Sequence, residues 1–249
     1  AVSRCATGAF SSWHCNFVLT EDAAALEAAG LLKRGDWQFH WHNHGYPGFG
    51  DFLARLRSRK RKNIRKERQQ VLAAGISVHW RSGPELSETE LDFVYRCYID
   101  TFHQYGNYPA LKQSFFRGIA RGLEGRFQVA IARQAGSPVA AAVFLAGNDR
   151  LYGRYWGSQL ELPGLHFELS YYQGIEFCIR NRLQVFESGA QGEHKISRGF
   201  TPSPTLSFHH VEHPGFRSAI ASHLQRERQW TNEYREKLDS ADPYRRDGT

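Results

Sequence analysis

The densest group of residues that could do chemistry lies between residues 150 and 200 of this 249-residue chain. Acylation of an amine needs a group that takes the amine proton and donors that stabilise the tetrahedral oxyanion. The candidates for the catalytic work are His166, Glu168, Glu187, Glu193 and His194. Since Lys195 and Arg198 would lower the pKa of a nearby carboxylate and weaken it as a base, an imidazole is the better proton acceptor. We therefore expect His194 or His166 as the base, with Glu187 or Glu193 orienting it or binding the acceptor amine.

Other side chains of this stretch could bind a substrate. The expected substrate-binding residues are Tyr152, Arg154, Tyr155, Trp156, Gln191, Lys195 and Arg198. Strand alternation predicts that Tyr152, Arg154 and Trp156 share one face and that Tyr155 lies on the other. Glu168 opens an apolar helical stripe, which suits a partner of the helix N-terminus and a site residue equally well. For residues 193–195 a surface loop with an ion pair is the competing interpretation; the nearby glycines favour a site.

A second feature is a basic run at residues 55–68, RLRSRKRKNIRKER, which holds nine basic side chains and one acid. The chain has a formal net charge of +7, so the rest of it is nearly neutral. Such a run is often a solvated helix face, but like charges on one face repel and favour an anionic partner such as an RNA backbone. The residues predicted to bind phosphate or nucleic acid are Arg57, Arg59, Lys60, Arg61, Lys62, Arg65, Lys66 and Arg68.

The elements that must position these residues follow from periodicity and turn signals. Strands are predicted at 11–18, 34–43, 76–80, 127–133, 139–145, 150–156, 183–187 and 206–211. Helices are predicted at 20–29, 52–71, 87–102, 111–123, 165–181 and 214–238, the third opened by a Ser87–Glu90 capping box. From residue 76 the order is β-α-α-β-β-β-α-β, which resembles the order of GNAT acyltransferases. The expected fold class is α/β (α+β), with a mixed, largely antiparallel central sheet flanked by helices.

Several unusual segments make the resemblance more specific. They are QFHWHNHGY at 38–46, the basic run, YGRYWG at 152–157, LHFELSYYQGIE at 165–176, ESGAQGEHKISRGF at 187–200 and DPYRR at 242–246. On these segments the chain resembles a Fem-like, GNAT-like family of predicted bacterial N-acyltransferases of peptidoglycan biosynthesis or recognition. The resemblance implies that the sheet opens at Gly157 to seat the acyl group.

The same resemblance implies a longer protein with two GNAT-like halves. Residues 1–45 would then be the tail of an N-terminal half, 46–73 a basic helical connector, and 74–249 the C-terminal GNAT-like domain. The chain contains no Met, which also predicts a processed or truncated piece.

Better-known Fem relatives transfer an amino acid from aminoacyl-tRNA to an amine, and for this branch the resemblance leaves donor and acceptor open. CoA-dependent GNAT proteins carry R/Q-x-x-G-x-G/A at a helix start. Here Arg154-x-x-Gly157-x-Gln159 lies too early and fails at its last position, and Pro163 removes a donor from the helix start. With the basic run, this favours aminoacyl-tRNA over acyl-CoA and predicts no tightly bound cofactor. The alternatives are a non-catalytic GNAT-like module that binds cell-wall peptide or RNA, and an acyl-CoA-dependent N-acetyltransferase.

Composition limits the other classes of function. With 41% hydrophobic residues the chain can form a core, and it has neither an apolar run long enough to span a membrane nor a visible secretory signal. Its four Cys are isolated, which is typical of reduced thiols in a cytoplasmic protein. His40, His42 and His44 alternate but have no clear fourth ligand, so no metal site is expected. The oligomeric state is not indicated.

Overall fold

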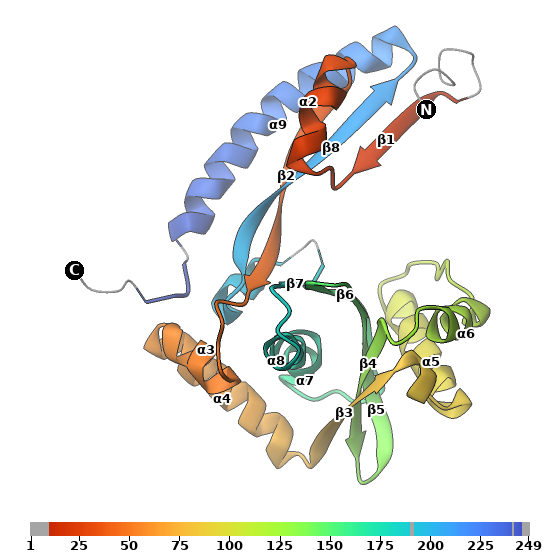
Figure 1. Ribbon diagram of the computed structural model, residues 1–249, viewed down its shortest axis with the longest axis vertical. Coiled ribbons are helices and arrows are strands. Elements are labelled where there is room, and N and C mark those ends of the chain that lie inside the picture. Colours follow the sequence, from red (N-terminus) through yellow and green to blue (C-terminus); the bar gives the residue numbers. More distant parts are fainter. Residues whose placement is uncertain (1–9, 190–191, 241, 246–249) are drawn as a thin grey trace. The chain divides into compact units, whose positions relative to one another are not determined.

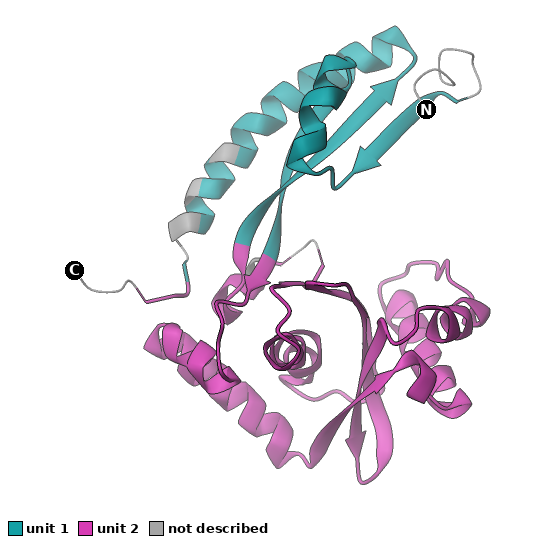
Figure 2. Ribbon diagram, viewed as in Figure 1, with its two compact units in different colours: residues 1–39, 202–242 teal, residues 40–201, 243–249 magenta. Residues whose placement is uncertain are grey.

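A computed structural model describes residues 10–189, 192–240 and 242–245 of the chain. They form two compact units (Figure 2), one with residues 1–39 and 202–242 and the other with residues 40–201 and 243–249. The expected boundaries group the residues differently, because 46–73 belongs to the second unit and 202–242 to the first. That residues 1–45 are the tail of another half stays a prediction. No helix in the described part of the chain is both long and apolar enough to cross a bilayer.

The first unit combines the two ends of the sequence (Figure 1). It contains β1 (Ser12–Asn16), α2 (Thr20–Ala28), α9 (Pro214–Ser240), most of β2 (Leu32–His42) and most of β8 (Thr201–Val211), in the strand order β1-β8-β2. β1 runs antiparallel to β8, with Ser12 opposite Val211. Arg34 on β2 donates to Glu227 on α9 over 2.9 Å, which fixes the helix to the strand.

The second unit contains the remaining elements. They are α3 (Phe49–Arg55), α4 (Ser58–Ala73), β3 (Ile76–Ser82), η1 (Gly83–Glu85), α5 (Glu88–Gln104), α6 (Gln113–Gly122), β4 (Phe127–Gln134), β5 (Ser137–Ala146), β6 (Arg150–Ser158), α7 (Leu165–Phe167), the π-helical turn η2 (Glu168–Tyr172), α8 (Gln173–Arg180), β7 (Val185–Glu187) and η3 (Glu193–Arg198). The strand order is β2-β7-β6-β5-β4-β3, antiparallel except for the parallel pair β6–β7. The predicted fold class and the GNAT-like order from residue 76 are confirmed.

Helices lie on both faces of this sheet (Figure 1). On one face α5 and α6 pack against β4 and β5 around Phe93, Phe116 and Val143, all less than 5% exposed. On the other face the Trp80 ring on β3 lies 4.4 Å from the ring of Phe177 on α8. Because β5 is covered on both faces, its Ala-Val-Phe run is buried, as its continuous apolar pattern predicts.

Two predicted helices are interrupted. The helix expected at 52–71 is two helices, because Leu56 is extended and fully buried and forms a β-bridge with Tyr244. Burial of Leu56 thus overrides the helix propensity of its neighbours. The helix expected at 165–181 contains the π turn of residues 168–172. The π turn contributes residues to the candidate site described next. The Ser87–Glu90 capping box at the start of α5 is confirmed.

Candidate active site

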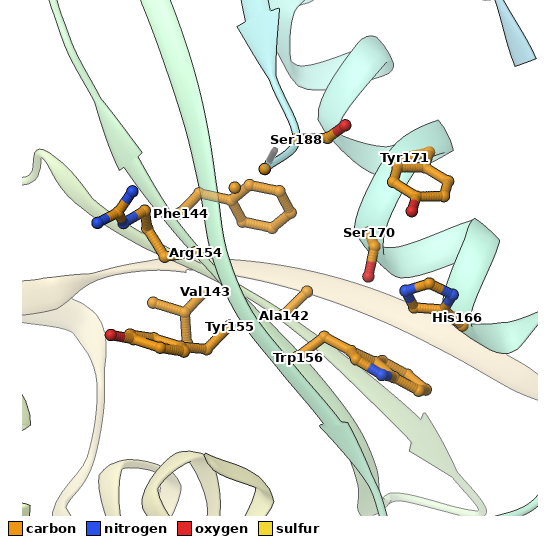
Figure 3. Close-up of a pocket in the computed structure, with 12 residues that line it drawn as sticks. Ala142, Val143, Phe144, Arg154, Tyr155, Trp156, His166, Ser170, Tyr171 and Ser188 are labelled. Carbon is orange, nitrogen blue, oxygen red and sulfur yellow. The ribbon is translucent and has the colours of Figure 1, made fainter. Parts of the chain in front are cut away.

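A small cavity lies where β6 and β7 separate. The two strands pair only from Arg150 opposite Val185 to Tyr152 opposite Glu187. Beyond that point a cavity of about 170 Å³ opens (Figure 3). It is lined by Ala142, Val143, Phe144, Gly153, Arg154, Tyr155, Trp156, His166, Ser170, Tyr171, Ser188 and Gly189. A pocket between two splayed strands is therefore a place where this unit can bind a small ligand.

A β-bulge shapes the strand side of the cavity. Tyr155 lies opposite Val143 and Gly153 opposite Phe144, so Arg154 is an extra residue in β6. The bulge shifts the alternation of side chains along β6. Tyr152 and Tyr155 therefore lie on one face of the strand, and Trp156 lies on the other face. The expectation that Tyr152, Arg154 and Trp156 share a face is therefore wrong.

The sheet opens earlier than the resemblance implied. Parallel pairing ends at Tyr152, and a Cβ on Gly153 would come within 3.3 Å of the Ser188 Cα. Gly157 is required by packing instead, because a Cβ there would overlap the backbone carbonyl of Cys97 on α5. Glycine at 157 thus permits close helix–strand packing, and the opening begins at Gly153.

The helical side of the cavity is supplied by α7 and the π turn. A π turn inserts a residue into a helix and is frequent at functional sites. Here it carries Ser170 and Tyr171, both of which line the cavity. Burial raises the pKa of the Tyr171 phenol to about 12, so its hydroxyl keeps its proton at neutral pH.

His166 is the titratable imidazole in the cavity wall. Its ring lies 4.9 Å from that of Trp156 and 5.4 Å from that of Tyr171 (Figure 3). Burial, with smaller contributions from the charges of His194, Arg198 and Lys195, lowers the pKa of His166 to about 4. The imidazole is thus neutral at physiological pH and has a lone pair that can accept a proton, and its low pKa makes it a weaker base than a free imidazole.

His194 contacts the cavity through Tyr171. Its Nε2 lies 2.9 Å from the Tyr171 hydroxyl, whereas its ring is exposed and does not line the cavity. Burial of part of the ring, then the charges of Arg198 and Lys195, lower its pKa. Two of its neighbours in the sequence were also predicted as site residues. The backbone of Glu193 is the first residue of η3, and Gln191 lies outside the described residues.

Lys195 is a buried cation beside the cavity. Its residue is only 2% exposed, and its Nζ donates to the carbonyl of Gly189, a lining residue, over 2.7 Å. Burial lowers the pKa of Lys195 to about 8. The amine is therefore mostly protonated at pH 7, yet it can lose its proton within a narrow pH range.

This burial predicts a specific pH dependence of stability. The pKa of Lys195 is about 8 in the folded chain and 10.5 when the side chain is not buried. Between pH 8 and pH 10.5 the unfolded chain therefore binds more protons than the folded chain. Stability due to this group therefore rises with pH in that window, by up to about 1.4 kcal/mol per pH unit. We expect Lys195→Met to be more stable than the parent protein at pH 7 and to lose that advantage by pH 10. Urea unfolding at pH 7, 8, 9 and 10 measures the difference; parallel curves would contradict it.

Two of the predicted catalytic acids are held in ion pairs. Glu168 is 5% exposed and accepts from Arg68 of α4 over 2.9 Å; Arg68 also donates to Glu176. Glu187 accepts from Arg150 over 2.9 Å. Neither carboxylate lines the cavity. Arg68, predicted to bind phosphate, is instead part of this ion-pair cluster.

A second ion pair connects α4 to the loop that carries His194. Arg198 is 7% exposed and donates to Glu67 of α4 over 2.8 Å and to the His194 carbonyl over 2.9 Å. Its guanidinium also lies 3.4 Å from the centre of the Phe167 ring, and Tyr172 donates to Glu67. Adjacent residues of α4, Glu67 and Arg68, thus hold both η3 and the π turn in place. This makes Arg198 a positioning residue, since it does not line the cavity.

The remaining basic side chains of the run differ in exposure. Arg57, Arg59, Lys62, Arg65 and Lys66 are exposed, and Lys60 and Arg61 are half-buried. Within the described ranges no carboxylate lies within ion-pair distance of Arg59, Lys60, Lys62, Arg65 or Lys66. α4 therefore has one face with ion pairs to the site and another with uncompensated positive charge.

The histidines of β2 do not form a metal site with their neighbours. His40 lies 3.9 Å from Glu187, and its ring centroid is 6.3 Å from that of His42. Over residues 10–189, 192–240 and 242–245 no group of three or more His, Cys, Asp or Glu converges in a way that could hold a metal ion.

The sequence did not single out four residues that define the site. These are Ser170, Tyr171, Ser188 and Glu67. Two of them carried a signal in the sequence. Glu67 is the one acid in the basic run, and Ser170 is a lone serine between Leu169 and Tyr171. Of the expected residues, the structure brings Arg154, Tyr155, Trp156 and His166 to the cavity wall and places His194, Lys195 and Arg198 behind it.

Comparisons with known proteins show the family of this chain and proteins of similar fold. The profile of a FemAB-like family, described as peptidoglycan biosynthesis/recognition, matches residues 1–246. Among solved structures, L-PGS from Bacillus licheniformis superposes with a TM-score of 0.61 at 9% identity, covering 89% of this chain and 75% of that chain. The C-terminal domain of a putative lysylphosphatidylglycerol synthetase from Agrobacterium fabrum gives 0.60 at 12% identity, over 88% and 73%. FemX gives 0.55 at 11% identity, over 89% and 79%. No curated protein sequence matches.

Proposed function

Since this chain belongs to the FemAB-like family of peptidoglycan biosynthesis or recognition, we propose that it is an N-acyltransferase that moves an acyl or aminoacyl group onto an amine. The observation that carries this proposal is the cavity between β6 and β7. Its wall combines a neutral imidazole, His166, with the Tyr171 side chain and a bulge at Arg154. These groups suit a small acyl group that is attacked by an amine.

In this reaction His166 would move one proton and Lys195 would stabilise one developing negative charge. As the amine nitrogen bonds to the acyl carbon, the neutral His166 imidazole takes the amine proton. The same proton then passes to the oxygen of the leaving hydroxyl as the donor ester bond breaks. Lys195, protonated below a pKa of about 8, places a positive charge behind Gly189 that favours the negative charge developing on the acyl oxygen.

Two observations support aminoacyl-tRNA as the donor. The exposed cations of α4 offer a surface for phosphates, and Glu67 and Arg68 attach that helix to the elements around the cavity. In contrast, the start of α7 is poorly suited to a CoA pyrophosphate, because Leu165 is fully buried and a Cβ on Gly164 would lie 3.3 Å from the Glu67 carbonyl oxygen. α4 thus covers the helix start.

The experiment is a transfer assay with the full chain. A labelled amino acid is supplied on charged tRNA, as acyl-CoA, or free, and the acceptors are cell-wall peptides with and without a free side-chain amine. We expect label on the amine-bearing peptide from charged tRNA only. Transfer from acyl-CoA alone would make the donor a CoA thioester. Binding of tRNA or peptide without any transfer would identify a non-catalytic module and overturn the proposal.

Neutralising α4 tests the tRNA surface separately. Lys62 and Lys66 lie one turn apart on the exposed side of the helix. We expect Lys62→Gln/Lys66→Gln to weaken tRNA binding and to lower the slope of log affinity against log salt by about 2, one for each lost phosphate contact. Fluorescence anisotropy between 50 and 200 mM salt measures both.

Arg180→Gln/Arg182→Gln is the matched control, because these two exposed arginines lie at and just after the end of α8, outside the basic run. It should leave affinity and slope unchanged. If both variants reduced the slope equally, binding would depend on net charge rather than on α4.

A further inference from the structure

The C-terminal segment Pro243–Arg245 pairs with another part of the second unit. Its backbone lies antiparallel to residues 55–57, where α3 leads into α4, and two hydrogen bonds of 2.9 Å enclose a β-bridge between Leu56 and Tyr244. Pro243 is buried, and none of the three residues lines the cavity. The segment thus docks as a short strand at the start of the basic helix.

The Tyr244 side chain reaches from this strand to η3. Its hydroxyl donates to the carbonyl of Gly199, the residue that ends η3, over 2.6 Å. Gly199 has a φ of +93°, and a Cβ there would lie 2.6 Å from the Phe52 ring and 3.3 Å from the Tyr244 hydroxyl. Glycine at 199 therefore permits both this backbone conformation and the close approach of Tyr244.

The residue after this glycine connects it to the cavity wall and to Lys195. Phe200 is fully buried, and its ring centroid lies 5.6 Å from that of Tyr171. Its N–H donates to the Lys195 carbonyl over 3.3 Å, and the Lys195 ammonium donates to the carbonyl of Gly189, which lines the cavity. A bond to the end of η3 therefore also restrains the segment that holds Lys195.

Burial of Lys195 acts against this arrangement. An ammonium loses favourable hydration when it is buried, so a movement of η3 that admits water to it is favourable for this group. The hydrogen bond that Tyr244 donates to the end of η3 opposes such a movement.

We propose that Pro243–Arg245 form a C-terminal latch in which Tyr244 is a positioning residue, because its bond to Gly199 holds η3 against the cavity and keeps Lys195 buried behind the acyl group. The effect on the reaction rests on the proposed acyl transfer, whereas the position of Lys195 can be measured without turnover. The latch gives a role to the unusual DPYRR segment. It also joins the start of the helix that offers its cations to tRNA to the end of the loop that carries the buried ammonium.

Tyr244→Phe is the first test, since it removes the hydroxyl and keeps the ring and the β-bridge. We expect kcat for transfer from charged tRNA to fall about fivefold, the factor that corresponds to one hydrogen bond, with KM for the tRNA unchanged. Activity of the parent protein should decrease above about pH 8, where Lys195 loses its charge, and in the variant this decrease should lie about 0.5–1 pH unit higher because water reaches the ammonium. Tyr108→Phe is the control, because this tyrosine of the same unit is 88% exposed, and it should change neither quantity.

Arg245→Pro tests the backbone pairing in the full chain. It removes the N–H that donates to the Arg55 carbonyl, and Arg245→Ala, which keeps this N–H, is the reference. We expect Arg245→Pro to lower kcat at least as much as Tyr244→Phe does. Combining the two changes should add little, because both act through the same latch.

Chemical labelling measures the position of Lys195 without turnover. Acetic anhydride labels the neutral amine, and mass spectrometry of the peptide that contains Lys195 gives the extent of labelling from pH 6 to pH 10. The charge of Lys195 helps to lower the pKa values of His40, His166 and His194, which are neutral above pH 7, and the pKa of Tyr171 is about 12, so none of these neighbours titrates in between. The midpoint should lie near pH 8 in the parent protein and about 0.5–1 pH unit higher in Tyr244→Phe and Arg245→Pro, with a faster limiting rate.

The outcomes separate the two proposals. A shifted labelling midpoint without transfer from any donor would keep the latch and overturn acyl transfer. In an active protein the latch requires both effects of Tyr244→Phe, so a lower kcat with an unchanged midpoint, or a shifted midpoint with an unchanged kcat, would overturn the positioning role. Equal changes in Tyr108→Phe, or a variant that only melts at a lower temperature, would overturn it as well.

Discussion

His166→Gln lowers kcat for acyl transfer by about 10²–10⁴-fold, the usual contribution of a general base. Glutamine keeps much of the volume and polarity of the side chain but cannot accept a proton. The loss should fall on kcat more than on KM, because the imidazole acts on the proton that moves in the transition state. Single-turnover transfer from charged tRNA measures the step directly.

The pH profile distinguishes this role from a structural one. Burial lowers the pKa of His166 to about 4, so the imidazole is already neutral from pH 5 upward. Protonation of His166 should therefore reduce activity only as pH falls toward 4, and the residual activity of His166→Gln should lack that acid limb. A separate decrease is expected above about pH 8, where Lys195 loses its charge.

His79→Gln is the control for these measurements, because His79 is exposed on β3, in the same unit, and contacts only Ser77 in the hydrogen bonds of the described residues. It should keep full activity. If His166→Gln did so as well, proton transfer would belong to another group, with His194 the next candidate through its bond to Tyr171.

The elements were predictable where a local pattern decides them. The buried run of β5 and the Ser87–Glu90 capping box follow from side-chain period and helix-end chemistry, and both are confirmed. The first unit was not predictable, because it joins residues 1–39 to 202–242 and sequence periodicity carries no information about such distant partners.

The site was predictable in its location but not in its geometry. Trp156 and His166 were expected and are found in the cavity wall. The bulge at Arg154 and the π turn each add one residue to a regular element, and either insertion changes which side chains face the cavity. Gly153 in the middle of a strand was the available signal for the bulge. The signal for Ser170 was weaker, a lone serine between Leu169 and Tyr171.

The basic run shows how a charge count can hide two roles. Read as one surface, it predicted a row of phosphate-binding residues that ended at Arg68. The structure assigns its last turn to internal ion pairs, Arg68 with Glu168 and Glu67 with Arg198. The one acid in the run was therefore its most informative residue, since a lone carboxylate among cations indicates a specific partner.

The ion pair between Glu67 and Arg198 should have the largest effect on stability. Glu67→Gln leaves the Arg198 guanidinium, 8% exposed as a side chain, without its counter-charge. Removing one partner of a buried ion pair costs about 3–5 kcal/mol. We expect about 3 kcal/mol, the low end, because Arg198 keeps its bonds to Tyr172 and the His194 carbonyl. The free energy of unfolding in urea measures the loss.

A matched control and a double variant identify the cause. Glu88→Gln breaks exposed pairs with Arg117 and Arg121 in the same unit and should leave the free energy of unfolding nearly unchanged, because solvent screens these charges. Glu67→Gln/Arg198→Met removes both charges and should be more stable than the sum of the single changes predicts, because no buried charge is left unpaired. Equal costs for Glu67→Gln and Glu88→Gln would mean that solvent compensates Arg198 and that α4 is not held to the site by charge. If instead the two costs differ as expected, the helix that offers its cations to a donor is the same helix that fixes the loop of His194.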